Sequence, residues 1–139
     1  MKTPRPFSVT LLALIVLSLS ALNLVRFGAA IAQWEALAEF APRPGPLYIL
    51  LTGLAWAAVG FPLWVSLWLN RPISYRAVLP ASFVYSAYYW LDRLLFQERP
   101  AQSNWPFALG VTVIVLSLAA FVAFHPRTRN FSKRESHDR

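Results

Sequence analysis

The composition of the chain indicates a membrane protein rather than a soluble domain. Of its 139 residues, 57% are hydrophobic and only 14% are charged, which is far from the balance of a soluble globular fold. A net charge of +7 is compatible with nucleic-acid binding, but the charges lie between apolar blocks, which favours a lipid bilayer as the partner and no nucleic acid. The absence of cysteine excludes disulfides, thiolate metal sites and CxxC redox chemistry.

Four apolar blocks of the sequence are each close to the ~20 residues that a helix needs to cross a hydrocarbon core of ~30 Å. We expect them to be helical, because lipid offers the backbone no hydrogen-bonding partner. The predicted fold is an all-α integral membrane protein with four transmembrane helices in an antiparallel up-down bundle. Within a transmembrane domain of residues 7–126, the predicted helices are 7–40 including an outer interfacial extension, 47–69, 77–97 and 105–125.

The start of the chain resembles a secretory signal peptide, with Ala30-Ile31-Ala32 as a candidate cleavage site before Gln33. The apolar run of about 19 residues is longer than the apolar region of a signal peptide, which has roughly 7–15, and Arg26 interrupts the approach to the site. We therefore expect residues 1–6 to be a cytoplasmic N-terminus followed by an uncleaved helix. Its extension from Arg26 to Phe40 is predicted to be amphipathic and to lie at the outer interface.

The second predicted helix carries Gly53, Ala57 and Gly60 on approximately one face. Small residues allow a neighbouring helix backbone to approach closely, which is how helices associate in lipid without a hydrophobic driving force. This face is therefore a predicted contact surface. We expect it to serve helix packing and to offer a route to a membrane-protein partner or a homo-oligomer.

Basic residues gather on one side of the predicted bundle. The opposite side carries four basic and four acidic residues, whose charges cancel. By the positive-inside rule, both termini are predicted to face the cytoplasm of a bacterial cell membrane, and the tail of residues 127–139 is predicted to be disordered and attracted to anionic lipid headgroups. The nine basic residues of the predicted inner side are Lys2, Arg5, Arg71, Arg76, Arg127, Arg129, Lys133, Arg134 and Arg139.

Asp92 and Arg93 place an acid and a base side by side in the third predicted span. Counted from Ala77, Asp92 lies about 22 Å along the helix, in the outer third of a ~30 Å core. A charge at this depth is costly unless it is paired. Since neighbouring helix positions point about 100° apart, the two are poorly placed to pair with each other. Each is expected to find a partner elsewhere.

Arg26, about 28 Å along the first helix, is predicted to pair with Asp92. Tyr88 is placed to donate a hydrogen bond to that carboxylate, and Tyr89 to stack on Arg93. The predicted polar cluster comprises Asn23, Arg26, Tyr88, Tyr89, Asp92 and Arg93. We favour an electrostatic lock between helices, because no acid lies at the predicted midplane, over an outward-facing proton or ligand site.

Other chemistry has little support in the sequence. His125 and His137 are too few and too isolated for a metal site, and there is no phosphate loop, carboxylate pair or Ser-His-Asp arrangement that suggests catalysis or a cofactor. Many unrelated small membrane proteins have four spans, so function does not follow from the fold. We expect an accessory, assembly or interaction protein rather than an enzyme. The alternatives are a small oligomeric transporter using the Asp/Arg cluster and, third, an enzyme acting on a lipid.

Overall fold

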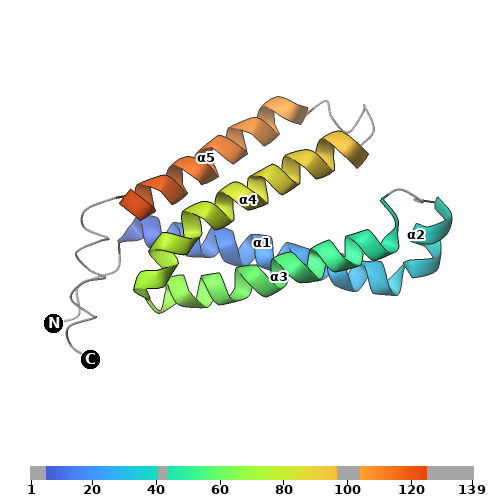
Figure 1. The fold of residues 1–139 in the computed structure, drawn as a ribbon, viewed down its shortest axis with the longest axis horizontal. Helices are drawn as coiled ribbons and strands as arrows, with labels where there is room; N and C mark the ends of the chain where they lie inside the picture. The colour runs from blue at the N-terminus through green and yellow to red at the C-terminus, as the bar shows by residue number, and fades with distance from the viewer. Residues whose placement is uncertain (1–5, 41–43, 97–103, 125–139) are drawn as a thin grey trace. The chain divides into compact units, whose positions relative to one another are not determined.

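The described part of the chain, residues 6–40, 44–96 and 104–124, consists of five α-helices and no strand in the computed structural model (Figure 1). The predicted all-α class is therefore confirmed for these residues. The predicted N-terminus and basic tail, and the predicted helix ends at residues 97 and 125, lie outside them. The helices are α1 (Phe7–Ala32), α2 (Trp34–Phe40), α3 (Pro46–Trp68), α4 (Pro72–Phe96) and α5 (Trp105–Phe124).

Three of these helices, α1, α3 and α5, are long and apolar enough to cross a membrane. Their 26, 23 and 20 residues correspond to about 39, 34 and 30 Å at 1.5 Å per residue. Helix α4 has 25 residues and is also long enough, but charged residues and tyrosines lower its average hydropathy. The structure is thus consistent with a membrane protein that has three candidate spans.

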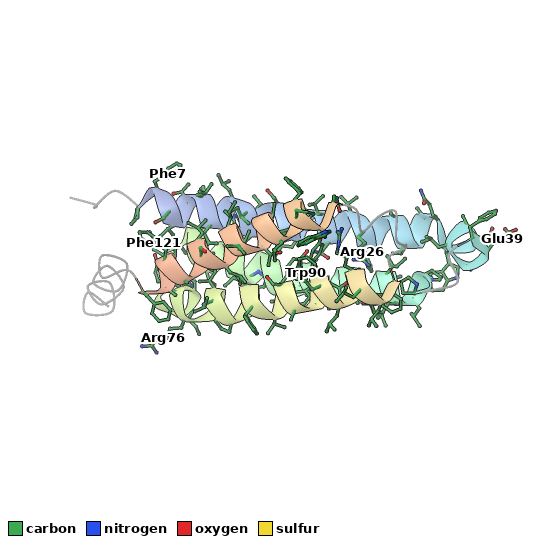
Figure 2. All side chains as sticks on the ribbon, turned by 90° about the horizontal axis from the view of Figure 1, so that it is seen from above. Phe7, Arg26, Glu39, Arg76, Trp90 and Phe121 are labelled. Carbon is green, nitrogen blue, oxygen red and sulfur yellow. The ribbon has the colours of Figure 1, made fainter. Side chains whose placement is uncertain are left out.

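Helices α1 and α2 are separated by a single turn residue, Gln33. Two backbone bonds end on this residue, since the Gln33 N–H donates to the Ala29 carbonyl and the Leu37 N–H donates to the Gln33 carbonyl, both at 2.9 Å. Helix α2 has no buried residue, and Figure 2 shows Glu39 projecting from its end. Helix α2 thus follows α1 directly in the chain and extends to Phe40, over the predicted extension, with its axis turned away from that of α1 (Figure 1). Its position at an interface stays a prediction.

Helix α3 ends in a Schellman motif, in which two backbone bonds reach back over the last turn. The Arg71 N–H donates to the Ser66 carbonyl at 2.9 Å, and the Asn70 N–H donates to the Leu67 carbonyl at 3.2 Å. Asn70 has a φ of 53°, a left-handed conformation that asparagine tolerates better than most residues. The motif ends α3 and reverses the chain within three residues.

Helix α4 begins at Pro72, five residues before the predicted start at Ala77. Proline suits a first helical position because the N–H that it lacks would have no partner there. The Arg71 carbonyl accepts the first bond, from the Ser74 N–H at 3.0 Å. Pro80 therefore lies inside the helix. The predicted helix bounds leave residues 70–76 as a connection, and the structure replaces it by a tight turn between Trp68 and Pro72.

The chain divides into two compact units, residues 14–64 and residues 1–13 with 65–139. In the first unit, α1 and α3 run side by side (Figure 1) and touch through glycine. A Cβ built on Gly53 would lie 2.9 Å from the backbone oxygen of Asn23 and 3.0 Å from the backbone nitrogen of Phe27. A Cβ on Gly60 would overlap the Ser20 hydroxyl. Ala57, between the two glycines, is buried.

The small-residue face of α3 thus packs on α1 of the same chain. Its predicted use by a partner or a second copy stays a prediction, and it would require α1 to move away from Gly53 and Gly60.

In the second unit, α4 and α5 run side by side in opposite directions (Figure 1). Several side chains of this unit are fully buried. They lie in the first turns of α1 and α4, at the end of α3 and in the last turns of α5, and they form the core beside the α3–α4 turn. These residues are Val9, Leu12, Ala13, Leu67, Ser74, Val78, Ala119 and Val122.

The close approach at Gly53 predicts that alanine is not tolerated there. We expect Gly53→Ala to lower the free energy of unfolding by about 1–3 kcal/mol, because backbone atoms must move to admit the methyl group. Gly28→Ala is the matched control, since a Cβ at Gly28 meets nothing within 4 Å and alanine has the higher helix propensity. Thermal unfolding in detergent measures both. Equal stability of the two variants would contradict the contact.

Candidate functional site

The side chains of α4 are segregated into two faces. Its exposed positions recur every three or four residues and, apart from Arg76, are apolar. Its polar side chains, its tyrosines and its tryptophan in the second half of the helix are half-buried or buried. This is the reverse of a helix at the surface of a soluble protein, where the exposed face is polar. The exposed positions are Ile73, Arg76, Pro80, Phe83, Val84, Ala87, Leu91, Leu94, Leu95 and Phe96.

Arg93 is the buried charge of the polar face, with 4% of its surface exposed. Its Nη1 donates to the Tyr89 hydroxyl oxygen at 3.1 Å, and its Nη2 donates to the Asn104 Oδ1. Tyr89 lies one turn before Arg93 on α4, while Asn104 immediately precedes α5. The guanidinium therefore links the end of α4 to the start of α5. It also lies in the last turn of α4, where the helix dipole favours a cation.

A second hydrogen bond joins α4 to α5, and it starts from Trp90, about one turn before Arg93 on α4. The Trp90 Nε1–H donates to the Thr112 Oγ1 at 3.3 Å, and Thr112 in turn donates to its own helix at the Ala108 carbonyl at 2.8 Å. Trp90 also meets the Tyr89 ring edge-on, with centroids 5.9 Å apart. Figure 2 shows Trp90 between the ribbons of α4 and α5. Together with Arg93, this forms what we call the α4–α5 clamp: Tyr89, Trp90, Arg93, Asn104 and Thr112.

The structure brings two residues of the predicted polar cluster together, Tyr89 and Arg93. Their contact is a hydrogen bond to the phenol oxygen, whereas stacking was predicted. Tyr88 lies against Tyr85, with ring centroids 6.2 Å apart. Asp92 is half-buried on α4, and the predicted donation from Tyr88 to its carboxylate stays a prediction.

Asn23 and Arg26 belong to the unit of residues 14–64, whereas Asp92 and Arg93 belong to the other unit. Asn23 is buried and donates to the Leu19 carbonyl of its own helix at 2.8 Å. Arg26 is half-buried. The predicted Arg26–Asp92 pair would join the two units and stays a prediction. Unchanged stability of Arg26→Gln and Asp92→Asn proteins, alone and combined, would contradict it.

Sequence reasoning missed two members of the clamp, Asn104 and Thr112. Asn104 stands directly before a helix, where an asparagine side chain commonly acts as a cap, and its side-chain oxygen accepts from Arg93. A signal was present, because Arg93 lies in the last turn of one helix and Asn104 directly before the next, and consecutive antiparallel helices place such ends near each other.

The comparisons with known proteins gave no match: no family model, no curated protein and no solved structure matches the chain. Among the residues that the structure describes, no group of three or more histidine, cysteine, aspartate or glutamate side chains is placed to hold a metal ion. The described bonds of the clamp join one cation and neutral hydrogen-bonding groups within the protein.

The clamp predicts that Asn104 stabilises the α4–α5 hairpin. Asn104→Ala removes an acceptor from a buried guanidinium, so we expect the free energy of unfolding to fall by about 1–3 kcal/mol. Asn104→Asp is the matched control, because it keeps an acceptor oxygen opposite Arg93 and should retain the stability. Unfolding of each protein in detergent, followed by circular dichroism, measures this. An Asn104→Ala protein as stable as the wild type would show that the bond contributes nothing.

Proposed function

We propose that α4 is a fourth membrane span and that the chain is a four-helix up-down membrane protein of the bacterial cell membrane, with both termini in the cytoplasm. The support is the segregation of α4: an apolar exposed face suits lipid, while polar side chains that turn inward suit a bundle. Its low average hydropathy comes from the inward face. The surface that lipid would meet includes Phe83, Ala87 and Leu91, all exposed.

We further propose that the protein is an accessory, assembly or interaction protein. The observation that carries this proposal is the α4–α5 clamp, in which Arg93 and Trp90 bond to Asn104 and Thr112 of the same chain. Groups engaged in this way stabilise the hairpin. A protein that binds a substrate or catalyses a reaction directs such groups toward a ligand. The role is then exerted through the outer helix surfaces, on another membrane protein.

A small oligomeric transporter is the second candidate. It is favoured by the concentration of Tyr88, Tyr89, Asp92 and Arg93 within two turns of α4, since ionisable groups within membrane segments often mark transport pathways. Asp92 would then bind the proton or ligand. This function requires a clamp that opens, which the accessory role does not.

The four-span topology predicts that Arg71 and Ser132 lie on the same side of the membrane, whereas three spans would place them on opposite sides. Because the chain has no cysteine, single Arg71→Cys, Ser132→Cys and Glu39→Cys variants can be labelled in intact cells with a membrane-impermeant maleimide. We expect only Glu39→Cys to react before the cells are permeabilised. Labelling of Ser132→Cys in intact cells, with Arg71→Cys protected, would contradict a transmembrane α4.

Purification from native membranes tests the proposed role. In a mild detergent, we expect the tagged chain to retain a stoichiometric membrane-protein partner, and a harsh detergent that separates subunits serves as the control. A homodimer that supports substrate-dependent proton flux in liposomes, lost in Asp92→Asn, would overturn the accessory role in favour of the transporter. A chain that is monomeric and inactive in flux assays would contradict both.

A further inference from the structure

The turn between α3 and α4 is held rigidly from both sides. Its backbone is fixed by the Schellman bonds at Asn70 and Arg71. The Tyr75 hydroxyl donates to the Asn70 Oδ1 at 3.2 Å, and the Ser74 hydroxyl donates to the Arg71 carbonyl at 2.6 Å. Tyr75 and Ser74 are both buried, so the side chains that fix the turn are themselves anchored in the core.

This rigid turn displays two cations. Arg71 and Arg76 are both exposed, and Figure 2 shows Arg76 pointing away from α4. Among the described residues of residues 65–124, the only acidic side chain is that of Asp92. It lies sixteen residues beyond Arg76 on α4, or about 24 Å along the helix. Among the residues of this unit that the structure describes, no acidic side chain therefore compensates the positive charge of the turn locally.

The same turn carries exposed apolar side chains beside its charges. Trp68 is 45% exposed, Leu69 is 52% exposed and Ile73 is 66% exposed. Tryptophan is enriched where a membrane meets water, because its ring suits the headgroup level. A surface of this kind offers apolar contacts and cationic hydrogen-bond donors within a few residues. It is therefore complementary to a phospholipid, which has acyl chains next to an anionic headgroup.

We propose that the α3–α4 turn binds the headgroup of an anionic phospholipid, with Arg71 and Arg76 donating to its phosphate oxygens and Trp68, Leu69 and Ile73 contacting its acyl chains. Arginine suits this role because its planar donors match phosphate geometry. Free inorganic phosphate offers the same oxygens but has no hydrocarbon part that could contact the apolar residues. The lipid is therefore the ligand that the turn fits. This inference rests on the proposed placement of the chain in a membrane.

Native mass spectrometry of the full chain in mild detergent tests the site. Phosphatidylglycerol and phosphatidylcholine with the same acyl chains are titrated into the wild type and an Arg71→Gln/Arg76→Gln variant. We expect the wild type to bind phosphatidylglycerol more tightly, and the variant to lose on the order of tenfold in that affinity with phosphatidylcholine binding unchanged. A Lys133→Gln/Arg134→Gln variant, with the same change in net charge placed in the tail, is the control. We expect its affinity for phosphatidylglycerol to fall clearly less.

Equal binding of both lipids by the wild type, or equal losses in the two charge variants, would overturn the proposal. Displacement of phosphatidylglycerol by millimolar inorganic phosphate would assign the site to free phosphate instead. Circular dichroism checks the fold, and if the double variant does not fold, Arg76→Gln is used, because Arg76 makes no bond within the turn. Retention of the chain in carbonate-washed membranes tests membrane placement separately, so a failed lipid preference overturns this site alone.

Discussion

A helix that carries polar and charged side chains can lie in lipid only if those groups are satisfied by the protein, because the hydrocarbon offers them nothing. Helix α4 meets this requirement at two positions of its second half. Arg93 is held by Tyr89 and Asn104, and Trp90 is held by Thr112. The proposed four-span fold depends on this clamp, since without α5 the polar face of α4 would oppose insertion. We infer that α4 and α5 enter the membrane as a hairpin.

The two helix pairs of the protein are joined by different forces. Helices α1 and α3 approach closely at Gly53 and Gly60, where backbone packing supplies the contact. Helices α4 and α5 are joined by side-chain hydrogen bonds, which specify register through individual donors and acceptors. The glycine contact is destabilised by substitutions that add volume, whereas the hydrogen-bonded contact is destabilised by substitutions that remove a donor or an acceptor. The turn at Asn70 connects the two kinds of packing through α3 and α4.

Much of the fold was predictable from the sequence, because long apolar blocks in a chain of this composition have to be helical. The contact face of Gly53 and Gly60 was also readable from the spacing of small residues. The start of α4 was not, since the Schellman turn at Asn70 and a helix that begins directly at Pro72 depend on local backbone bonds with a weak sequence signal. Asn104 was missed because capping its own helix and accepting from Arg93 are equally plausible uses of one side chain, and only the three-dimensional contact decides between them.

Helix α4 is proposed to present its apolar face to lipid and its polar face to the protein, and labels on two adjacent residues distinguish these two faces. Ala87 is exposed and Ser86 is half-buried, and neighbouring helix positions point about 100° apart. In a chain with no native cysteine, Ala87→Cys and Ser86→Cys each take a single spin label in liposomes. The account predicts frequent collisions with oxygen and few with a water-soluble nickel chelate at position 87, and few with either at position 86. Frequent collisions with the nickel chelate at both positions would contradict it.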